Sequence, residues 1–144
     1  MKILLHPILV FLFLSQFPAL AFADDPSVYQ TVEIEHAVIT PSKSSDKSLL
    51  KLFVRNVSSG NVTILGISSP SKAGATILVK VDENKYSELS SLTLTTEEGG
   101  DFTSSHMVFR LEDSFNSLKA NKKLQLKLIM SNGEIPFTAH IAER

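Results

Sequence analysis

The stretch LQLKLIMSNGEIPFTAHI (residues 124–141) carries the strongest fold signal in the sequence. Both of its arms alternate between apolar and polar residues, which is the pattern of half-buried strands. Between the arms lies Ser131-Asn132-Gly133, and Asn-Gly between alternating runs is the strongest short hairpin signal. The sequence therefore predicts a β-hairpin here. Its inward positions are Leu124, Leu126, Leu128 and Met130 on the first strand and Phe137, Ala139 and Ile141 on the second.

Outward from this hairpin, similar short runs recur through the chain, separated by turn residues. The runs cover residues 30–39, 49–57, 62–67, 75–81, 88–96 and 104–111, and the main turns cover 58–61, 82–86 and 98–101. The polar segment 112–121 has room for one short helical turn. About eight short strands at near-regular spacing predict an all-β domain, an antiparallel Greek-key β-sandwich of the cupredoxin-like or immunoglobulin-like kind. No linker divides the chain, so we expect a single domain over residues 24–144.

The first 23 residues have the layout of a signal peptide. Lys2 precedes an apolar run over residues 3–14, and Ala21-Phe22-Ala23 places small residues at the −3 and −1 positions of a cleavage site. The alternative is an uncleaved anchor, but the apolar run falls short of the roughly 20 residues that a membrane span requires. We expect cleavage after Ala23 and a periplasmic or secreted protein that begins at Asp24, with no transmembrane segment in the mature chain.

Composition narrows the chemistry available to the mature chain. There is no cysteine, so disulfides and thiolate ligands are absent, and a metal site would need His, Met or carboxylate side chains. The formal net charge of the full sequence is −1, and no basic run suggests a nucleic-acid partner.

Enzyme motifs are missing as well: there is no G-x-S-x-G elbow, no phosphate-binding glycine loop and no H-E-x-x-H. We therefore expect a protein that is not an enzyme. Because a Ser-His-Asp triad is defined in space rather than by spacing, an exported hydrolase stands as a third and weaker hypothesis.

Five side chains of the mature chain are soft or borderline metal ligands: His36, His106, Met107, Met130 and His140. Imidazole and thioether suit copper, and thioether favours Cu(I). His106-Met107 is the one place where both occur together, so these two residues are the candidate metal ligands. Neighbours on a strand point to opposite faces, and the alternative is that Met107 fills the core and His106 is solvated.

The other three have structural interpretations. His36 follows Val32 and Ile34 on one face and is expected to be partly buried and hydrogen-bonded. Met130 is expected in the core, and His140 in solvent.

The order of segments resembles the periplasmic copper chaperones called PCu(A)C. The residues that carry the resemblance are VEIEHA (32–37), LFVRNV (52–57), LGISSP (65–70) with Ala73-Gly74, then Gly99-Gly100 and the His106-Met107 strand. Members of that family are exported cupredoxin-like sandwiches that carry Cu(I) towards the copper A centre of cytochrome c oxidase. The resemblance implies copper as the ligand and a cuproprotein, such as the copper A domain of that oxidase, as the partner.

The family's ligand positions are only partly occupied by ligands in this sequence. The family uses a His-x-Met pair after the A-G loop, a later Met, and a second His-x-Met pair after the Gly-Gly segment. These positions fall on Val79 and Val81, near Leu92, and on Ser105 and Met107, or alternatively on His106 and Val108. The first hypothesis is therefore a PCu(A)C-like copper-binding protein with a weakened or lost Cu(I) site. The second is a metal-free interaction or assembly module on the same fold.

Overall fold

Ten strands and one helical turn are formed by the residues that the computed structural model describes, which are 31–71, 74–104 and 106–143. Their bounds are β1 Val32–Pro41, β2 Lys47–Asn56, β3 Val62–Ser68, β4 Gly74–Asp82, β5 Lys85–Leu89, β6 Leu92–Leu94, β7 Gly99–Asp101, β8 Met107–Ser114, α1 Phe115–Leu118, β9 Lys123–Met130 and β10 Gly133–Ile141. The signal peptide predicted for residues 1–23 lies outside the described ranges. Within those ranges, no helix has the length and apolarity that crossing a membrane requires.

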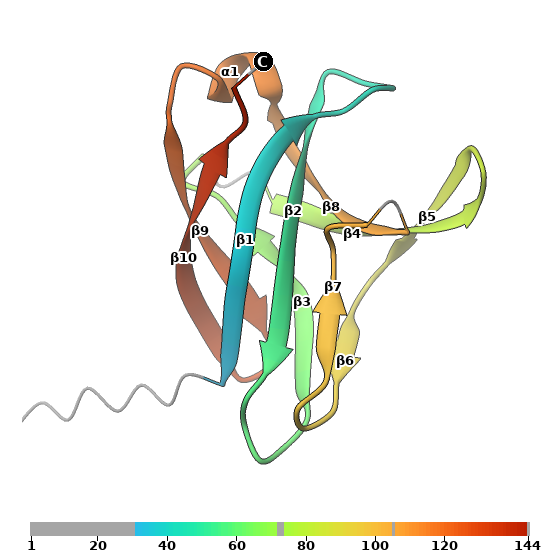
Figure 1. Ribbon diagram of the computed structural model, residues 1–144, viewed down its shortest axis with the longest axis vertical. Coiled ribbons are helices and arrows are strands. Elements are labelled where there is room, and N and C mark those ends of the chain that lie inside the picture. Colours follow the sequence, from blue (N-terminus) through green and yellow to red (C-terminus); the bar gives the residue numbers. More distant parts are fainter. Residues whose placement is uncertain (1–30, 72–73, 105, 144) are drawn as a thin grey trace, which may run out of the picture.

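The strands form one sheet that closes on itself (Figure 1). Seven strands make the ring in the order β4, β8, β2, β1, β10, β9 and β3, and β3 pairs with β4 again to complete it. β5 and β6 extend the sheet at its margins, and β7 adds to β2. All pairs are antiparallel except β1 with β10, which is parallel. The all-β prediction is confirmed, with the two layers of the expected sandwich arising from a single closed sheet.

The hairpin of residues 124–141 forms as predicted. Leu126, Leu128, Met130, Ala139 and Ile141 are buried in the core, because alternation directs them to the inside of the ring. Two of the expected inward residues, Leu124 and Phe137, are half-buried and pack against the same core. Met130 pairs with Gly133, so the two loop residues are Ser131 and Asn132. The helical turn expected within residues 112–121 is α1.

A bulge in β1 overturns the prediction for His36. The pairing register between β1 and β2 shifts between Glu35 and Val38, and His36 has φ 54° in the left-handed region. The extra residue turns the strand by one position, so Ala37 and Ile39 point inward in place of His36 and Val38. The His36 side chain is 80% exposed, and its expected burial was wrong.

The segment 98–101 was expected to be a turn, but Gly99–Asp101 is strand β7, paired with β2. The chain reverses earlier, at Thr96 and Glu97, where Glu97 has φ 64°. A Cβ on Gly99 would lie 2.4 Å from Cζ of Phe53, so glycine is what allows β7 to lie over the Phe53 ring. The Gly-Gly pair therefore serves a close strand contact rather than a turn.

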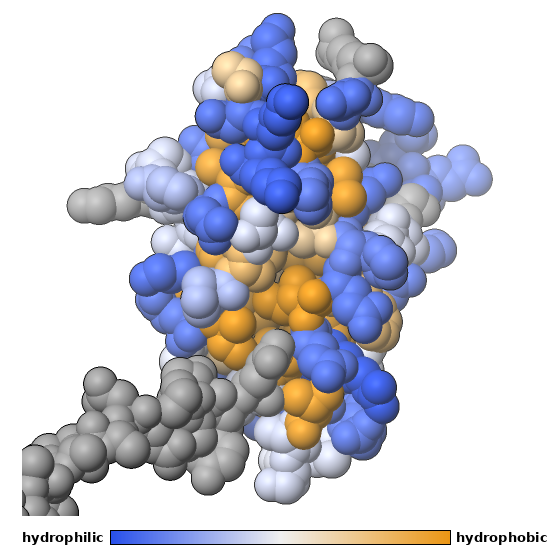
Figure 2. Space-filling view, turned by 60° about the vertical axis from the view of Figure 1, so that its left-hand side comes forward, coloured by the Kyte–Doolittle hydropathy of each residue, from blue (hydrophilic) through white to orange (hydrophobic). Residues whose placement is uncertain are grey.

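The seam between β1 and β10 is closed along only part of its length. The paired residues are Val38 with His140 and Ile39 with Ile141. Along the residues that precede these in each strand, β1 and β10 are apart (Figure 1). Ile34, Ile135 and Phe137 face the interior along this divergence and are half-buried. Figure 2, which brings this side forward, shows hydrophobic surface between hydrophilic margins.

Two carboxylates hold the ends of the segment around β7. The Glu98 carboxylate accepts hydrogen bonds from Thr95 N (2.7 Å) and Oγ1 (2.9 Å), and Asp101 Oδ1 accepts from Thr103 N (2.8 Å) and Oγ1. These bonds favour the ionised form. The backbone and then the side chain of Thr95 lower the pKa of Glu98 below 4.5, and the side chain and then the backbone of Thr103 lower the pKa of Asp101 below 3.8.

We expect this segment to contribute to acid sensitivity. Because both pKa values are lower in the folded than in the unfolded chain, the contribution to stability is complete above about pH 4.5 and is lost as pH falls through the folded values. Between pH 5 and pH 2, the variant E98Q/D101N should lose less free energy of unfolding than the unmodified protein, as measured by urea denaturation at each pH. An acid dependence identical to that of the unmodified protein would show that these hydrogen bonds do not form in solution.

Candidate functional site

Met107 lies at the rim of the closed sheet, at the end of the core. It is the first residue of β8 and is paired directly with Val79 of β4. Directly opposed residues in an antiparallel pair share a face, so the Met107 thioether and the Val79 side chain lie side by side. The next pair on this face is Phe109 with Ile77, both fully buried, and Met107 itself is half-buried. The thioether is thus partly open to solvent above the core.

His106 is brought to the same strand end as Met107. It lies in the bend just before β8, and its carbonyl accepts a hydrogen bond from Lys80 N at 2.7 Å. Its side chain is exposed, whereas Met107 packs against the core. The two candidate ligands are therefore adjacent in sequence but differ in burial.

Of the other positions expected from the resemblance, Ser105 lies outside the described residues, and Val79, Val81, Leu92 and Val108 carry only hydrocarbon. Val81 is 63% exposed at an irregularity between β4 and β5. Leu92 in β6 is half-buried, and its Cδ2 lies 3.5 Å from where a Cβ of Gly100 would stand. Val79, Val81 and Leu92 therefore offer no atom to a metal.

The other soft ligands lie elsewhere. His36 projects from the β1 bulge with Nε2 3.8 Å from Glu35 Oε2, and His140 is exposed near the end of β10, as expected. Met130 is buried, with its sulfur 3.9 Å from Thr31 Oγ1, which confirms its place in the core. Among the described residues, no three His, Cys, Asp or Glu side chains are grouped so that they could hold a metal ion.

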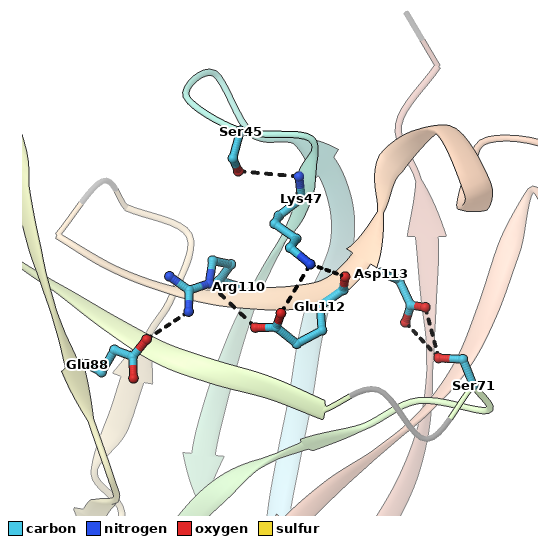
Figure 3. Close-up of polar contacts among 7 residues, drawn as sticks. All are labelled: Ser45, Lys47, Ser71, Glu88, Arg110, Glu112 and Asp113. Carbon is cyan, nitrogen blue, oxygen red and sulfur yellow. Dashed lines mark hydrogen bonds and ion pairs between the residues drawn. The ribbon is translucent and has the colours of Figure 1, made fainter.

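The outer face of β8 carries an ion-pair ladder that the sequence did not predict (Figure 3). Arg110 Nη2 donates to Glu88 Oε1 of β5 at 2.8 Å, and Arg110 Nε lies 3.7 Å from Glu112 Oε1. Lys47 of β2 reaches the other oxygen of Glu112 at 3.2 Å. This ladder links β5, β8 and β2, and its charges are mutually satisfied, so its role is structural.

Asp113, next in β8, fixes the loop that follows β3. Its carboxylate accepts hydrogen bonds from Ser71 Oγ at 2.9 and 3.0 Å (Figure 3). It also accepts one from Ser69 Oγ at 3.0 Å. The two serines flank Pro70 in the loop used for the resemblance. Asp113 therefore helps to place β4, and with it Val79, beside β8.

The hairpin of β4 and β5 projects from the closed sheet (Figure 1). Its second strand ends the sheet, and it has no strand partner on its outer side among the described residues. Two of the three exposed large hydrophobic residues in the described ranges, Val81 and Tyr86 at 63% and 43%, lie on this hairpin. These two apolar side chains stand among exposed polar and charged residues of the hairpin, including Asp82, Glu83 and Lys85.

These features define a small β-barrel domain with one half-buried thioether at its rim. The fold is that of PCuAC domains. A copper-bound PCuAC domain from PmoF2 is 14% identical, with a TM-score of 0.63 over 79% of this chain and 94% of that chain. An apo PCuAC domain from PmoF1 is also 14% identical, with a TM-score of 0.61 over 79% of this chain and 95% of that chain. An apo PmoF2 PCuAC domain is 16% identical, with a TM-score of 0.58 over 77% of this chain and 89% of that chain. At these identities the likeness establishes the fold.

No protein-family model matches the chain, and no curated protein matches it in sequence.

Proposed function

We propose that this chain is an exported, non-catalytic PCuAC-like protein that handles copper through a much reduced Cu(I) site at the rim of the barrel. The observation that carries the proposal is the direct pairing of Met107 with Val79. The register of the resemblance assigns both positions to one metal site, and the fold brings them together. Met107 is the ligand on the inner face, and His106 is the second candidate, available if the strand end rearranges.

The proposed site is weak because of its ligand count. A thioether suits Cu(I), but Val79, Val81 and Leu92 stand where further ligands are expected. An ion held by one thioether, or by a thioether and one imidazole, keeps coordination positions open to water and to competing ligands. The proposed partner is a cuproprotein of the periplasm, such as the copper A domain of cytochrome c oxidase, since the family's role is to deliver copper there.

The two methionines of the mature chain offer a matched test of this assignment. M107L is expected to remove most Cu(I) binding and M130L to leave it unchanged, because Met107 is at the rim and Met130 is sealed in the core. Both changes keep side-chain volume nearly constant, so each should cost less than about 1.5 kcal/mol of stability. Binding would be measured by competition with a Cu(I) chelator. Adding H106A to M107L should abolish what remains.

Equal binding by M107L and the unmodified protein would contradict the assignment of Met107.

The second candidate, a metal-free interaction module, is favoured by the exposed Val81 and Tyr86 on the free hairpin. An edge strand of this kind can accept a strand from a partner. Complete absence of Cu(I) binding in the unmodified protein would select this candidate over the first.

A further inference from the structure

A groove lies at the end of the barrel where the loop after α1 meets the end of β10. Its lining includes Lys119, Lys122, Lys123 and His140 around the buried side chains of Phe115 and Ile141. Its volume of about 690 Å³ falls within the range of about 300–1,000 Å³ that is usual for small-molecule sites. Figure 2 shows hydrophilic side chains gathered over the end of the molecule at which α1 lies in Figure 1.

The backbone under the lysines is held in place. Lys119 N donates to Phe115 O at 2.9 Å, and Asn121 N donates to Leu118 O at 2.9 Å. The carbonyl of Lys122 accepts from Ile141 N at 3.1 Å, which joins the loop to β10. Lys123 then begins β9 and pairs with His140. The positions from which these side chains project are therefore fixed by the fold, which lowers the entropy cost of binding.

The charge of the groove is one-sided. Within the described ranges, the Lys and Arg residues that form ion pairs are Lys47, Arg55, Arg110 and Lys127. None of these pairs involves Lys119, Lys122 or Lys123. The described residues that line the groove thus include three lysines and one carboxylate, Glu143, in a chain whose formal net charge is −1. Such a concentration of one sign attracts an ion of the other.

We propose that this groove binds the phosphate group of an anionic ligand. Lysine binds phosphate as a point charge, several ammonium groups match a multiply charged oxyanion, and the His140 imidazole can add an N–H donor. The apolar floor suits the organic part of a phosphate ester. A soluble phosphate ester and a phospholipid headgroup share this chemistry, and the experiment separates them.

The test compares two triple variants of equal charge. K119Q/K122Q/K123Q removes the groove lysines, whereas K51Q/K80Q/K85Q removes three lysines that do not line the groove. In the unmodified protein, inorganic phosphate is expected to shift the backbone amide NMR signals around the groove in a saturable manner. The groove variant should bind phosphate at least tenfold more weakly, and the control variant should bind within twofold of the unmodified protein.

Co-sedimentation with lipid vesicles distinguishes a phospholipid headgroup from a soluble phosphate ester. Co-sedimentation with phosphatidylglycerol vesicles but not with phosphatidylcholine vesicles, lost in the groove variant only, assigns the site to a lipid headgroup. Saturable phosphate binding without co-sedimentation assigns it to a soluble ester. Should the groove variant lose its dispersed NMR spectrum, the three single Lys→Gln variants replace it, and each should weaken binding.

Three results would overturn the proposal: neither phosphate nor vesicles bind, both triple variants lose binding equally, or acetate shifts the same signals as strongly as phosphate.

Discussion

Replacing Asn56 with alanine is expected to lower the free energy of unfolding by about 3 kcal/mol or more, a large part of the 5–15 kcal/mol that stabilises a domain of this size. Asn56 is the last residue of β2 and is fully buried. Its Nδ2 lies within hydrogen-bond distance of Gly60 O (2.7 Å), Leu94 O (3.1 Å) and Thr95 O (3.0 Å). Alanine would leave these carbonyls without their donor inside the protein.

The same side chain also orders the turn after β2. Asn56 Oδ1 accepts from Ser58 N at 2.9 Å and from Ser58 Oγ at 2.7 Å. Urea denaturation of N56A would measure the loss, with N61A as the control because Asn61 is exposed in the same turn and should change stability by no more than about 0.5 kcal/mol. Equal stability of the two variants would mean that the buried amide does not join β2 to the segment around β6.

The largest effect on binding is expected from restoring the two missing ligands on β4. The variant V79H/V81M should raise the affinity for Cu(I) by about 10²–10⁴, the range by which linked binding groups exceed single ones. An imidazole at position 79 would stand beside the Met107 thioether, because the two positions are directly paired. Chelator competition measures the gain.

The control for this restoration keeps the new ligands and removes the old one. V79H/V81M/M107L should lose most of the gained affinity if all three side chains bind one ion. A gain of the same size in this triple variant would place the new site away from Met107 and would contradict the proposed register.

Much of the fold could be predicted because its signals are local. The hairpin of residues 124–141 has both alternation and a turn, so its inward residues Leu126 and Leu128 were identified correctly. By contrast, the β1 bulge depends on His36 in a left-handed conformation, and no glycine marks it. Gly99-Gly100 was wrongly assigned to a turn. Glycine is needed at position 99 because of the Phe53 ring, which is distant in sequence and could not be placed there from the sequence.

The candidate sites divide in the same way. The order of segments assigned Val79 and Met107 to ligand positions of the family, but their direct pairing is known only from the structure. The groove joins lysines of the loop after α1 to His140 of β10, and it exists only because β9 and β10 pair. The ladder through Arg110 likewise joins three strands that are separated in sequence.

The most direct test of the proposed function is the Cu(I) affinity of the unmodified protein over residues 24–144, measured against a series of chelators of graded affinity. A site with one thioether and at most one imidazole should release Cu(I) to the weaker chelators of the series, and M107L should reduce even that binding. Tight one-to-one retention of Cu(I) that survives H106A/M107L would contradict the account and would direct attention to His36 and His140.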